Sequence, residues 1–459
     1  MKRIWLLLGL SGTFILAPLA ALMAGETPAP APVTAPVTTA APAASATSQG
    51  KIDSGDTAWV LTSSAFVMVM TLPGLAFFYG GLVRRKNVLS ILMQCCIALG
   101  VISVQWVLFG YSLAFHPGPG FWGGFDWRFL HGVGLAPYAD YAPTISHQLF
   151  MIFQAMFAVI TPALIIGAFA ERMKFSAFVI FLLLWATFVY DPITHWVWGM
   201  GGWLKGIGTL DFAGGTVVHI NAGIAAIVTA LVIGRRKGYG QPVPPHNLPF
   251  TIVGAGLLWF GWFGFNAGSA LAANGLAVSA FVVTNTAAAM AGVTWAFIEW
   301  VHHRKPTTLG FATGAVAGLV AITPASGFVD VLGAIAIGAG VSVVCFIMVA
   351  KVKPLLGYDD SLDAFGVHGI GGTWGALATG LFATKAVNAA GADGLFYGNP
   401  AQFLIQLKAV AVTVVYSAVA TLVIYKLIDK VVGVRIEEKD EIKGLDLTEH
   451  SEAGYTVLE

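Results

Sequence analysis

Long uncharged apolar segments recur along almost the whole chain, and short polar loops separate them. Each segment approaches the ~20 residues that a helix needs to cross ~30 Å of hydrocarbon. The pattern therefore predicts an all-α polytopic membrane protein with eleven transmembrane helices. Their expected ranges are 57–83, 91–115, 147–170, 176–196, 212–234, 248–272, 277–300, 309–325, 328–350, 362–384 and 402–428.

The chain before the first of these helices has two parts. Residues 1–24 begin with Lys2 and Arg3, continue with an apolar stretch and end among small residues near Ala24. This order is typical of a secretory signal peptide, with an uncleaved helix as the alternative. Residues 25–56 are rich in Ala, Pro and Thr, which predicts an extended periplasmic linker. The expected divisions are a signal peptide (1–24), a linker (25–56), a transmembrane domain (57–430) and a cytoplasmic tail (431–459).

The Lys and Arg residues predict how the helices are oriented, because loops on the cytoplasmic side carry an excess of basic residues. If the mature N-terminus lies outside, the segments on the outer side hold only Lys51, Arg128, Lys205, Lys385 and Lys408. An odd number of helices then places the C-terminal tail in the cytoplasm, as expected for an inner (cytoplasmic) membrane protein. The loops on the inner side hold Arg84, Arg85, Lys86, Arg172, Lys174, Arg235, Arg236, Lys237, Arg304, Lys305, Lys351 and Lys353.

Composition supports the membrane environment without naming a binding partner. Hydrophobic residues make up 57% of the chain and charged residues 10%, so membrane lipid is its expected surroundings. The 24 Lys and Arg nearly balance the 23 Asp and Glu, and no surplus of charge points to nucleic acid. The three cysteines lie in apolar segments, where a disulfide framework is not expected. No nucleotide or metal motif is present, and we expect no cofactor.

Two expected helices, the fifth and the tenth, each place one histidine among glycines. The segments are GGTVVHINAG around His219 and DAFGVHGIGG around His368. Because the tenth helix follows the fifth by five helices, an odd offset, the two copies cross the membrane in opposite directions. This is typical of an inverted repeat, here helices one to five against six to ten, with a site near the midplane. The glycines favour close approach of the helices.

The two histidines are the leading candidates for a functional site, because ionisable groups inside a membrane are costly. A single histidine would be interpreted as a packing residue, whereas a repeat-related pair favours a conduction path. A zinc site is the rival interpretation, but zinc needs a third or fourth ligand and none lies at similar depth with suitable spacing. Two imidazoles that share a proton would form a mostly neutral pair of hydrogen-bonding side chains in an otherwise apolar tunnel.

Aromatic residues near the outer ends of the helices are the second set of candidates. Trp198 ends the fourth helix, Phe157 lies in the third, and Trp262, Phe265 and Ser269 lie in the sixth within GWFGFNAGS. The face of an aromatic ring can hold a cation that has begun to lose its water. Taken singly, each residue is equally well explained as a membrane-interface or packing residue.

Several segments resemble the ammonium transporter family, the Amt branch of the Amt/Mep/Rh superfamily. The resemblance runs from about Asp56 to Tyr455. It implies a homotrimer with one pore per subunit, eleven helices, an outer N-terminus and a pseudo-twofold axis. It is densest in PGLAFFYGGLVRRKNVLS, AERMKFSA, DFAGGTVVHINAGIA, PHNLPF, GWFGFNAGSA, FGVHGIGGTWG and GLDLTEHSEAGY.

The resemblance also implies roles for residues at the outer side. Trp198, Phe157 and Ser269 resemble the family's recruitment site, which holds ammonium by cation–π contact and a hydroxyl acceptor. Phe157 and Phe265 resemble the stacked pair that closes the pore below that site. Asp211 matches the family's aspartate ahead of the first histidine. We favour a capping role for Asp211 at the start of its helix over direct contact with the cation.

Deeper in the membrane, His219 and His368 resemble the twin histidines of the family. Trp262, Phe78 and Tyr79 are further candidates for the pore wall or the cytoplasmic exit. The expected function is transport of ammonium, with methylammonium as an analogue, for nitrogen uptake. Ammonium would lose a proton and ammonia would cross the dry region; whether the proton is relayed across stays open at this level.

Other function classes share some of these features. A sensor would share every pore motif but would be suspected from an appended signalling domain, and none follows Tyr455. A membrane enzyme with a dihistidine metal site would need more ligands, and we expect no enzyme activity. A Rhesus-type gas channel is closer, but Trp198 and the segment GLDLTEHSEAGY favour the Amt branch.

The tail and the basic loops resemble the face on which PII-type signalling trimers dock. Such a partner would have to supply the regulation, because this chain has no nucleotide motif of its own. Asp359, Asp360 and Asp363, just before the tenth helix, could couple the tail to the pore. Capping of that helix is the simpler interpretation.

Overall fold

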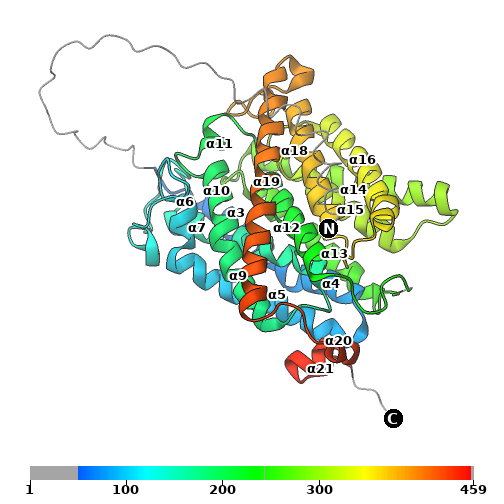
Figure 1. Ribbon diagram of the computed structural model, residues 1–459. Coiled ribbons are helices and arrows are strands. Elements are labelled where there is room, and N and C mark those ends of the chain that lie inside the picture. Colours follow the sequence, from blue (N-terminus) through cyan, green and yellow to red (C-terminus); the bar gives the residue numbers. More distant parts are fainter. Residues whose placement is uncertain (1–49, 242, 456–459) are drawn as a thin grey trace, which may run out of the picture.

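A computed structural model describes residues 50–241 and 243–455 of the chain, so the expected signal peptide and most of the expected linker lie outside the described residues. Within this part the chain is helical and contains no β-strand. Figure 1 shows one bundle of long helices whose two ends differ. The short helix α11 (Trp203–Gly206) lies at one end, called the vestibule end. Helices α20 (Glu438–Lys443) and α21 (Leu445–His450) lie at the other, called the tail end.

The first half of the bundle contains five long helical segments, four of which include a π-helical stretch, labelled η. They are α3 (Ser54–Val69) with η1 (Met70–Leu75) and α4 (Ala76–Leu82); α5 (Val88–Gln105) with η3 (Trp106–Gly110) and α6 (Tyr111–Phe115); α7 (His147–Leu164) followed by α8 (Ile166–Phe169); α9 (Phe175–Trp185) with η5 (Ala186–Tyr190) and α10 (Asp191–Trp198); and η6 (Gly215–Ile220) with α12 (Asn221–Ile233).

The second half contains five further helical segments and one additional long helix. Its segments are α13 (Leu248–Gly268); α14 (Gly275–His303); α15 (Thr308–Ile322); α16 (Val331–Ile347) with η7 (Met348–Val352) and α17 (Lys353–Leu356); η8 (Phe365–Gly369) with α18 (Ile370–Phe382); and the additional α19 (Pro400–Val431).

Many of these segments have the length and composition of membrane-crossing helices. Nine segments of the described residues qualify. Thr308–Ile322 is apolar but shorter, and Phe365–Phe382 is not among the nine. The prediction of an all-α chain with many apolar helices is therefore confirmed. Each of the expected ranges overlaps a helical segment.

Polar side chains determine where several helices begin, because the first amides of a helix have no partner within it. The side chain of Ser146 accepts a hydrogen bond from Leu149 at the start of α7, and Asn247 accepts one from Phe250 at the start of α13. Thr307 does the same for α15. These short polar caps follow directly from the sequence between the apolar segments.

Glycines allow the two histidine-bearing segments to touch. A Cβ atom added to Gly223 would lie 2.1 Å from the backbone nitrogen of Gly369, and one added to Gly372 would lie 2.9 Å from the Cβ of His219. Each glycine follows the histidine of its own segment by one helical turn, since Gly223 follows His219 and Gly372 follows His368. The two halves therefore meet backbone to backbone beside the histidines.

A cluster of buried charges lies at the tail end. The carboxylate of Glu171 pairs with Arg84 at 2.7 Å and with Arg236 at 3.3 Å, and Asp359 pairs with Arg236 at 2.9 Å. Burial raises the pKa of Glu171, but attraction to Arg236 and Arg84 outweighs it and holds this pKa below its usual value. Burial lowers the pKa of Arg172 to about 10. The cluster joins four of the loops at this end.

The C-terminal segment binds to the same end of the bundle through its acidic side chains. Asp446 accepts a hydrogen bond from the backbone amide of Ser90 in the first turn of α5, at 2.8 Å. Glu449 accepts one from the amide of Phe175, the first residue of α9, also at 2.8 Å. Carboxylates at these positions complement the positive ends of helices. The tail therefore caps two helices of the bundle.

The contact at Gly223 generates a test of how the two halves are held together. Replacing Gly223 by Ala should lower the free energy of unfolding by about 1–3 kcal/mol, because the added methyl group would overlap the backbone at Gly369. The measurement is thermal unfolding of the purified protein in detergent. Gly256→Ala is the matched control, since open space surrounds Gly256 on α13. Equal melting temperatures for the two variants would contradict the close approach.

Candidate functional site

Three cavities follow one another between the vestibule end and the tail end. The outer vestibule has a volume of about 240 Å³, the central cavity about 10 Å³ and the inner cavity about 70 Å³. Phe78, Val316 and His368 line both the central and the inner cavity. Phe157 lines the vestibule and its neighbour Phe265 lines the central cavity. Every site residue expected from the sequence lines at least one of the three.

The vestibule brings together the three residues expected to recruit a cation. The rings of Phe157 and Trp198 meet edge to face with centroids 5.9 Å apart, and Ser269 lines the same cavity. The Ser269 hydroxyl donates to the carbonyl of Phe265 at 2.8 Å, which leaves its lone pairs free to accept from a cation. The Trp198 indole donates to the carbonyl of Asp211 at 2.8 Å, which fixes the ring.

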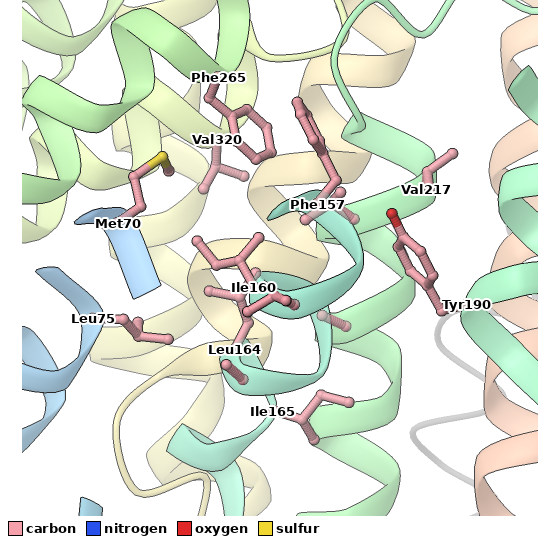
Figure 2. Packing of buried hydrophobic residues seen from close by; sticks show 14 of the residues in the cluster. Met70, Leu75, Phe157, Ile160, Leu164, Ile165, Tyr190, Val217, Phe265 and Val320 are labelled. Carbon is pink, nitrogen blue, oxygen red and sulfur yellow. The ribbon is translucent and has the colours of Figure 1, made fainter. Parts of the chain in front are cut away.

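Two phenylalanine rings separate the vestibule from the central cavity. Phe157 on α7 and Phe265 on α13 have ring centroids 4.2 Å apart with an angle of 30° between their planes, and both are fully buried. Figure 2 shows the two rings side by side, with Ile160 and Leu164 further along α7. The passage is closed at this point in the structure.

His219 and His368 meet at the central cavity. Their Nδ1 atoms are 3.3 Å apart, and the rings stack with centroids 5.3 Å apart and an angle of 17°. One ring must donate and the other accept, so a single proton lies between the two nitrogens. Both histidines lie in π-helical stretches, η6 and η8. In such stretches each backbone hydrogen bond spans one residue more than in an α-helix, and they are frequent at functional sites.

The wall around the histidines is almost wholly apolar. The ring of Trp262 stacks on His219 with centroids 5.4 Å apart, and its indole nitrogen donates to the Thr323 hydroxyl at 2.8 Å. The Nε2 atom of His219 is buried without a hydrogen-bond partner. At about 10 Å³ the cavity has room for about one small molecule the size of water. The aliphatic and aromatic residues of the wall are Met70, Leu75, Phe78, Ile160, Leu164, Leu258, Phe265 and Val316.

Phe78 and Tyr79 occupy the route toward the tail end but differ in position. Phe78 lines both the central and the inner cavity. Tyr79 lines only the inner cavity, where its hydroxyl donates to the carbonyl of Leu164 at 3.0 Å. Asp363 also lines the inner cavity and binds Lys353 at 2.5 Å. Polar side chains therefore line the path again between the histidines and the tail end.

An aspartate caps the start of each histidine-bearing segment. Asp211 accepts four backbone hydrogen bonds, from Gly214, Gly215, Thr216 and Val217, at 2.6–3.1 Å. Burial raises the pKa of Asp211, while the four amides oppose the rise. This geometry is helix capping and satisfies the amides that open η6.

Asp360 is the counterpart of Asp211 in the second half. It accepts hydrogen bonds from Ala364 at 3.2 Å and Phe365 at 2.8 Å, and it precedes His368 by the same interval that separates Asp211 from His219. Burial raises its pKa to about 6, although Lys353 opposes the rise. Asp360 was expected only to cap its helix or to couple the tail to the pore, and its equivalence to Asp211 was not predicted, although the repeated interval in the sequence was an available signal.

The metal-ligand side chains in the described part of the chain do not form a metal site. Over residues 50–241 and 243–455, no three side chains of His, Cys, Asp or Glu come together in a geometry suited to a metal ion. The histidine pair is instead surrounded by apolar groups and by the Trp262 ring. Chemically, the arrangement offers aromatic faces and a hydroxyl group in the vestibule, a closed apolar passage and a pair of imidazoles within it.

Comparison with known proteins identifies relatives over nearly the whole described chain. Residues 58–455 match the Ammonium Transporter Family. An ammonium transporter of Bacillus subtilis is 54% identical over 87% of this chain and 98% of its own length. An ammonium transporter of Aquifex aeolicus is 50% identical over 89% of this chain and 95% of its own length. Ammonium transporter Amt1 of Archaeoglobus fulgidus is 48% identical over 88% of this chain and 99% of its own length.

Solved structures have the same fold. The crystal structure of Candida albicans Mep2 aligns with a TM-score of 0.80 and 36% sequence identity, covering 85% of this chain and 88% of that one. A structure described as a sensor Amt protein aligns with a TM-score of 0.79 and 30% identity, covering 86% and 98%. The likeness therefore extends to the arrangement of the helices.

The pKa of Asp360 predicts a pH dependence of stability. Between its ordinary value of 3.8 and about 6, the folded protein keeps a proton that the unfolded chain has released. The free energy of unfolding should therefore fall as the pH rises through this window, by up to about 3 kcal/mol, and level off above it. Thermal unfolding of the wild type and of Asp360→Asn between pH 4 and 8 measures this contribution, which the variant should lack.

Asp126→Asn is the control for this measurement, because Asp126 is exposed in a loop at the vestibule end. It should retain the slope of the wild type between pH 4 and 6. A slope that is the same in Asp360→Asn and in the wild type would show that the carboxyl of Asp360 titrates normally.

Proposed function

The chain belongs to the ammonium transporter family, and from this premise we propose how it carries ammonium across the membrane. Ammonium binds in the vestibule, gives up a proton, and crosses the central cavity as ammonia past His219 and His368. The observation that carries this proposal is the central cavity itself. It has a volume of about 10 Å³ and is lined by apolar side chains, two imidazoles and an indole.

Recruitment rests on the aromatic faces and the hydroxyl group of the vestibule. The rings of Trp198 and Phe157 offer cation–π contacts, and the Ser269 hydroxyl has lone pairs directed away from the bond it donates to Phe265. A cation at this position exchanges part of its water for these contacts. The site is compatible with any small cation, so discrimination has to arise further along the path.

Discrimination follows from the cost of moving a charge into the apolar passage. Potassium resembles ammonium in charge and size and would have to enter without water, because the cavity cannot hold a hydration shell. Ammonium differs because it can lose its charge by releasing a proton to water in the vestibule, which has a volume of about 240 Å³. Neutral ammonia then passes the rings of Phe157 and Phe265 when they separate, and potassium is left outside.

The histidine pair provides hydrogen-bonding partners for ammonia inside the passage. The two Nδ1 atoms already share a proton, and Nε2 of His219 is buried without a partner. A small molecule with donors and an acceptor can satisfy that nitrogen. The same pair can take up or pass a proton, and a measured current per transported nitrogen decides whether the proton crosses with ammonia.

We also propose eleven crossings with an outer N-terminus and a cytoplasmic tail. Lys86, Lys174 and Lys237 lie in alternate loops, and all three donate hydrogen bonds to residues between Val432 and Glu441. Basic loops therefore lie at the same end as the tail, as the bias toward cytoplasmic basic loops requires. The vestibule would then face the outside of the inner membrane.

Assembly and regulation are further parts of the proposed function. Each subunit of a homotrimer would contain its own pore, since all three cavities are lined within one chain. A PII-type partner would bind at the tail end, where the basic loops and the tail meet. Ammonium sensing is the second candidate function, favoured by the tail because Asp446 and Glu449 cap helices of the pore bundle.

Substitution of the histidines tests the proposed conduction path. His219→Ala and His368→Ala should each abolish selective ammonium flux, because ammonia loses its hydrogen-bonding partners in the passage and the pair that can take up a proton is broken. The measurement is the current evoked by ammonium and by potassium in proteoliposomes, with methylammonium uptake as a second assay. His131→Ala, in an exposed loop, is the control. Undiminished transport that still excludes potassium in both variants would contradict the role of the pair.

Substitution of Trp198 tests recruitment separately from conduction. Trp198→Leu should raise the half-saturating ammonium concentration about two- to thirty-fold, which is the usual range of a lost cation–π contact. The maximal current should change much less, since the central cavity is untouched. A lowered maximal current with unchanged half-saturation would assign Trp198 to the passage instead of the binding step.

A further inference from the structure

Lys205 brings an ammonium group of the protein itself into the vestibule. Its Nζ atom donates to the backbone carbonyl of Trp198 at 3.1 Å and lies 5.6 Å from the centroid of the Tyr141 ring. Lys205, Tyr141, Asp140 and Ser269 all line the same cavity of about 240 Å³. A primary ammonium group is thus held there by a carbonyl oxygen and an aromatic face.

These are the kinds of contact that a free ammonium ion would also make. We propose that the Trp198 carbonyl, the Tyr141 ring and the Asp140 carboxylate form a second, outer subsite for small ammonium cations, and that Lys205 occupies it as a tethered competitor. The subsite deepens the proposed function and rests on it. It differs from the recruitment site because it uses the backbone of Trp198 and the ring of Tyr141.

The acceptors of this subsite are rigid. The hydroxyl of Tyr141 donates to the carbonyl of Phe115 at 2.6 Å and accepts from the amide of Met200 at 2.8 Å. The indole of Trp198 is held by the carbonyl of Asp211 at 2.8 Å. Ring and carbonyl therefore stay in place whether or not Lys205 is present, and the subsite is formed without its occupant.

The occupant, in contrast, can leave readily. Lys205 lies in α11, a helix of only four residues, and its side chain is exposed. One hydrogen bond and one cation–π contact hold its ammonium group, and such contacts are weak at an exposed site. Four flexible methylene groups let Lys205 swing toward water while an external cation takes its place.

The charges at the vestibule determine how strongly removal of Lys205 should change the binding of a cation. Lys205 and Asp140 carry opposite charges at the vestibule, and the carboxylate of Asp211 is occupied by four backbone amides. Removing the positive charge should raise the local concentration of cations. A unit charge within about 8 Å, in surroundings only slightly less polar than water, changes binding about two- to five-fold.

The test compares three variants by the half-saturating ammonium concentration of the current in proteoliposomes at low ionic strength. Lys205→Met should lower this concentration about two- to five-fold, with a similar maximal current, and Asp140→Asn should raise it. Lys408→Met is the matched control. The Nζ atom of Lys408 lies 5.8 Å from the ring centroid of Trp203, which is also in α11, but Lys408 does not line the vestibule. High salt should shrink all the differences.

The outcomes separate the tethered competitor from a purely structural lysine. If Lys205 only positions Trp198, its loss should raise the half-saturating concentration, and either that result or no change would overturn the proposed subsite. A wild type that shows neither ammonium-dependent current nor methylammonium uptake would instead contradict the proposed function. The subsite is then tested by equilibrium binding of methylammonium, in which Lys205→Met must bind more tightly than the wild type.

Discussion

The burial of two imidazole rings against each other in an apolar bundle is the constraint on which the rest of the structure depends. A polar group away from water is costly unless it finds a partner, and His219 and His368 find one in each other. That contact requires two helices to approach within backbone distance, which the glycines at 223 and 372 permit. It also requires each helix to begin well inside the protein, where Asp211 and Asp360 replace water at the unpaired amides.

The two halves bury their histidines in the same way. The two ends of the bundle, in contrast, differ from each other. Each half supplies an aspartate, a π-helical stretch, a histidine and a glycine at the same intervals, so the centre is close to symmetric. The vestibule end adds aromatic rings, a hydroxyl group and the ammonium group of Lys205, whereas the tail end adds paired charges around Glu171. The aromatic rings and the hydroxyl group of the vestibule are thus separated in space from the closed apolar passage.

Much of this arrangement could be predicted from local patterns. Apolar length predicted the helices because burial in lipid depends on composition over about 20 consecutive residues. The boundaries were less certain: the eighth helix was expected over 309–325 but ends at Ile322, where the chain turns. The interval between Asp360 and His368 was visible in the sequence, but its meaning needed the hydrogen bonds to Ala364 and Phe365.

The sequence by itself determined the class of protein, the apolar helices, the pair of histidines and the aromatic residues, because residue type and periodicity are properties of neighbouring positions. Tertiary structure alone decided which atoms meet. The shared proton between the Nδ1 atoms, the closed pair Phe157 and Phe265, and the contact of Lys205 with the Trp198 carbonyl join residues from different helices or loops. Such contacts follow from the packing of the whole bundle, and no local pattern encodes their distances.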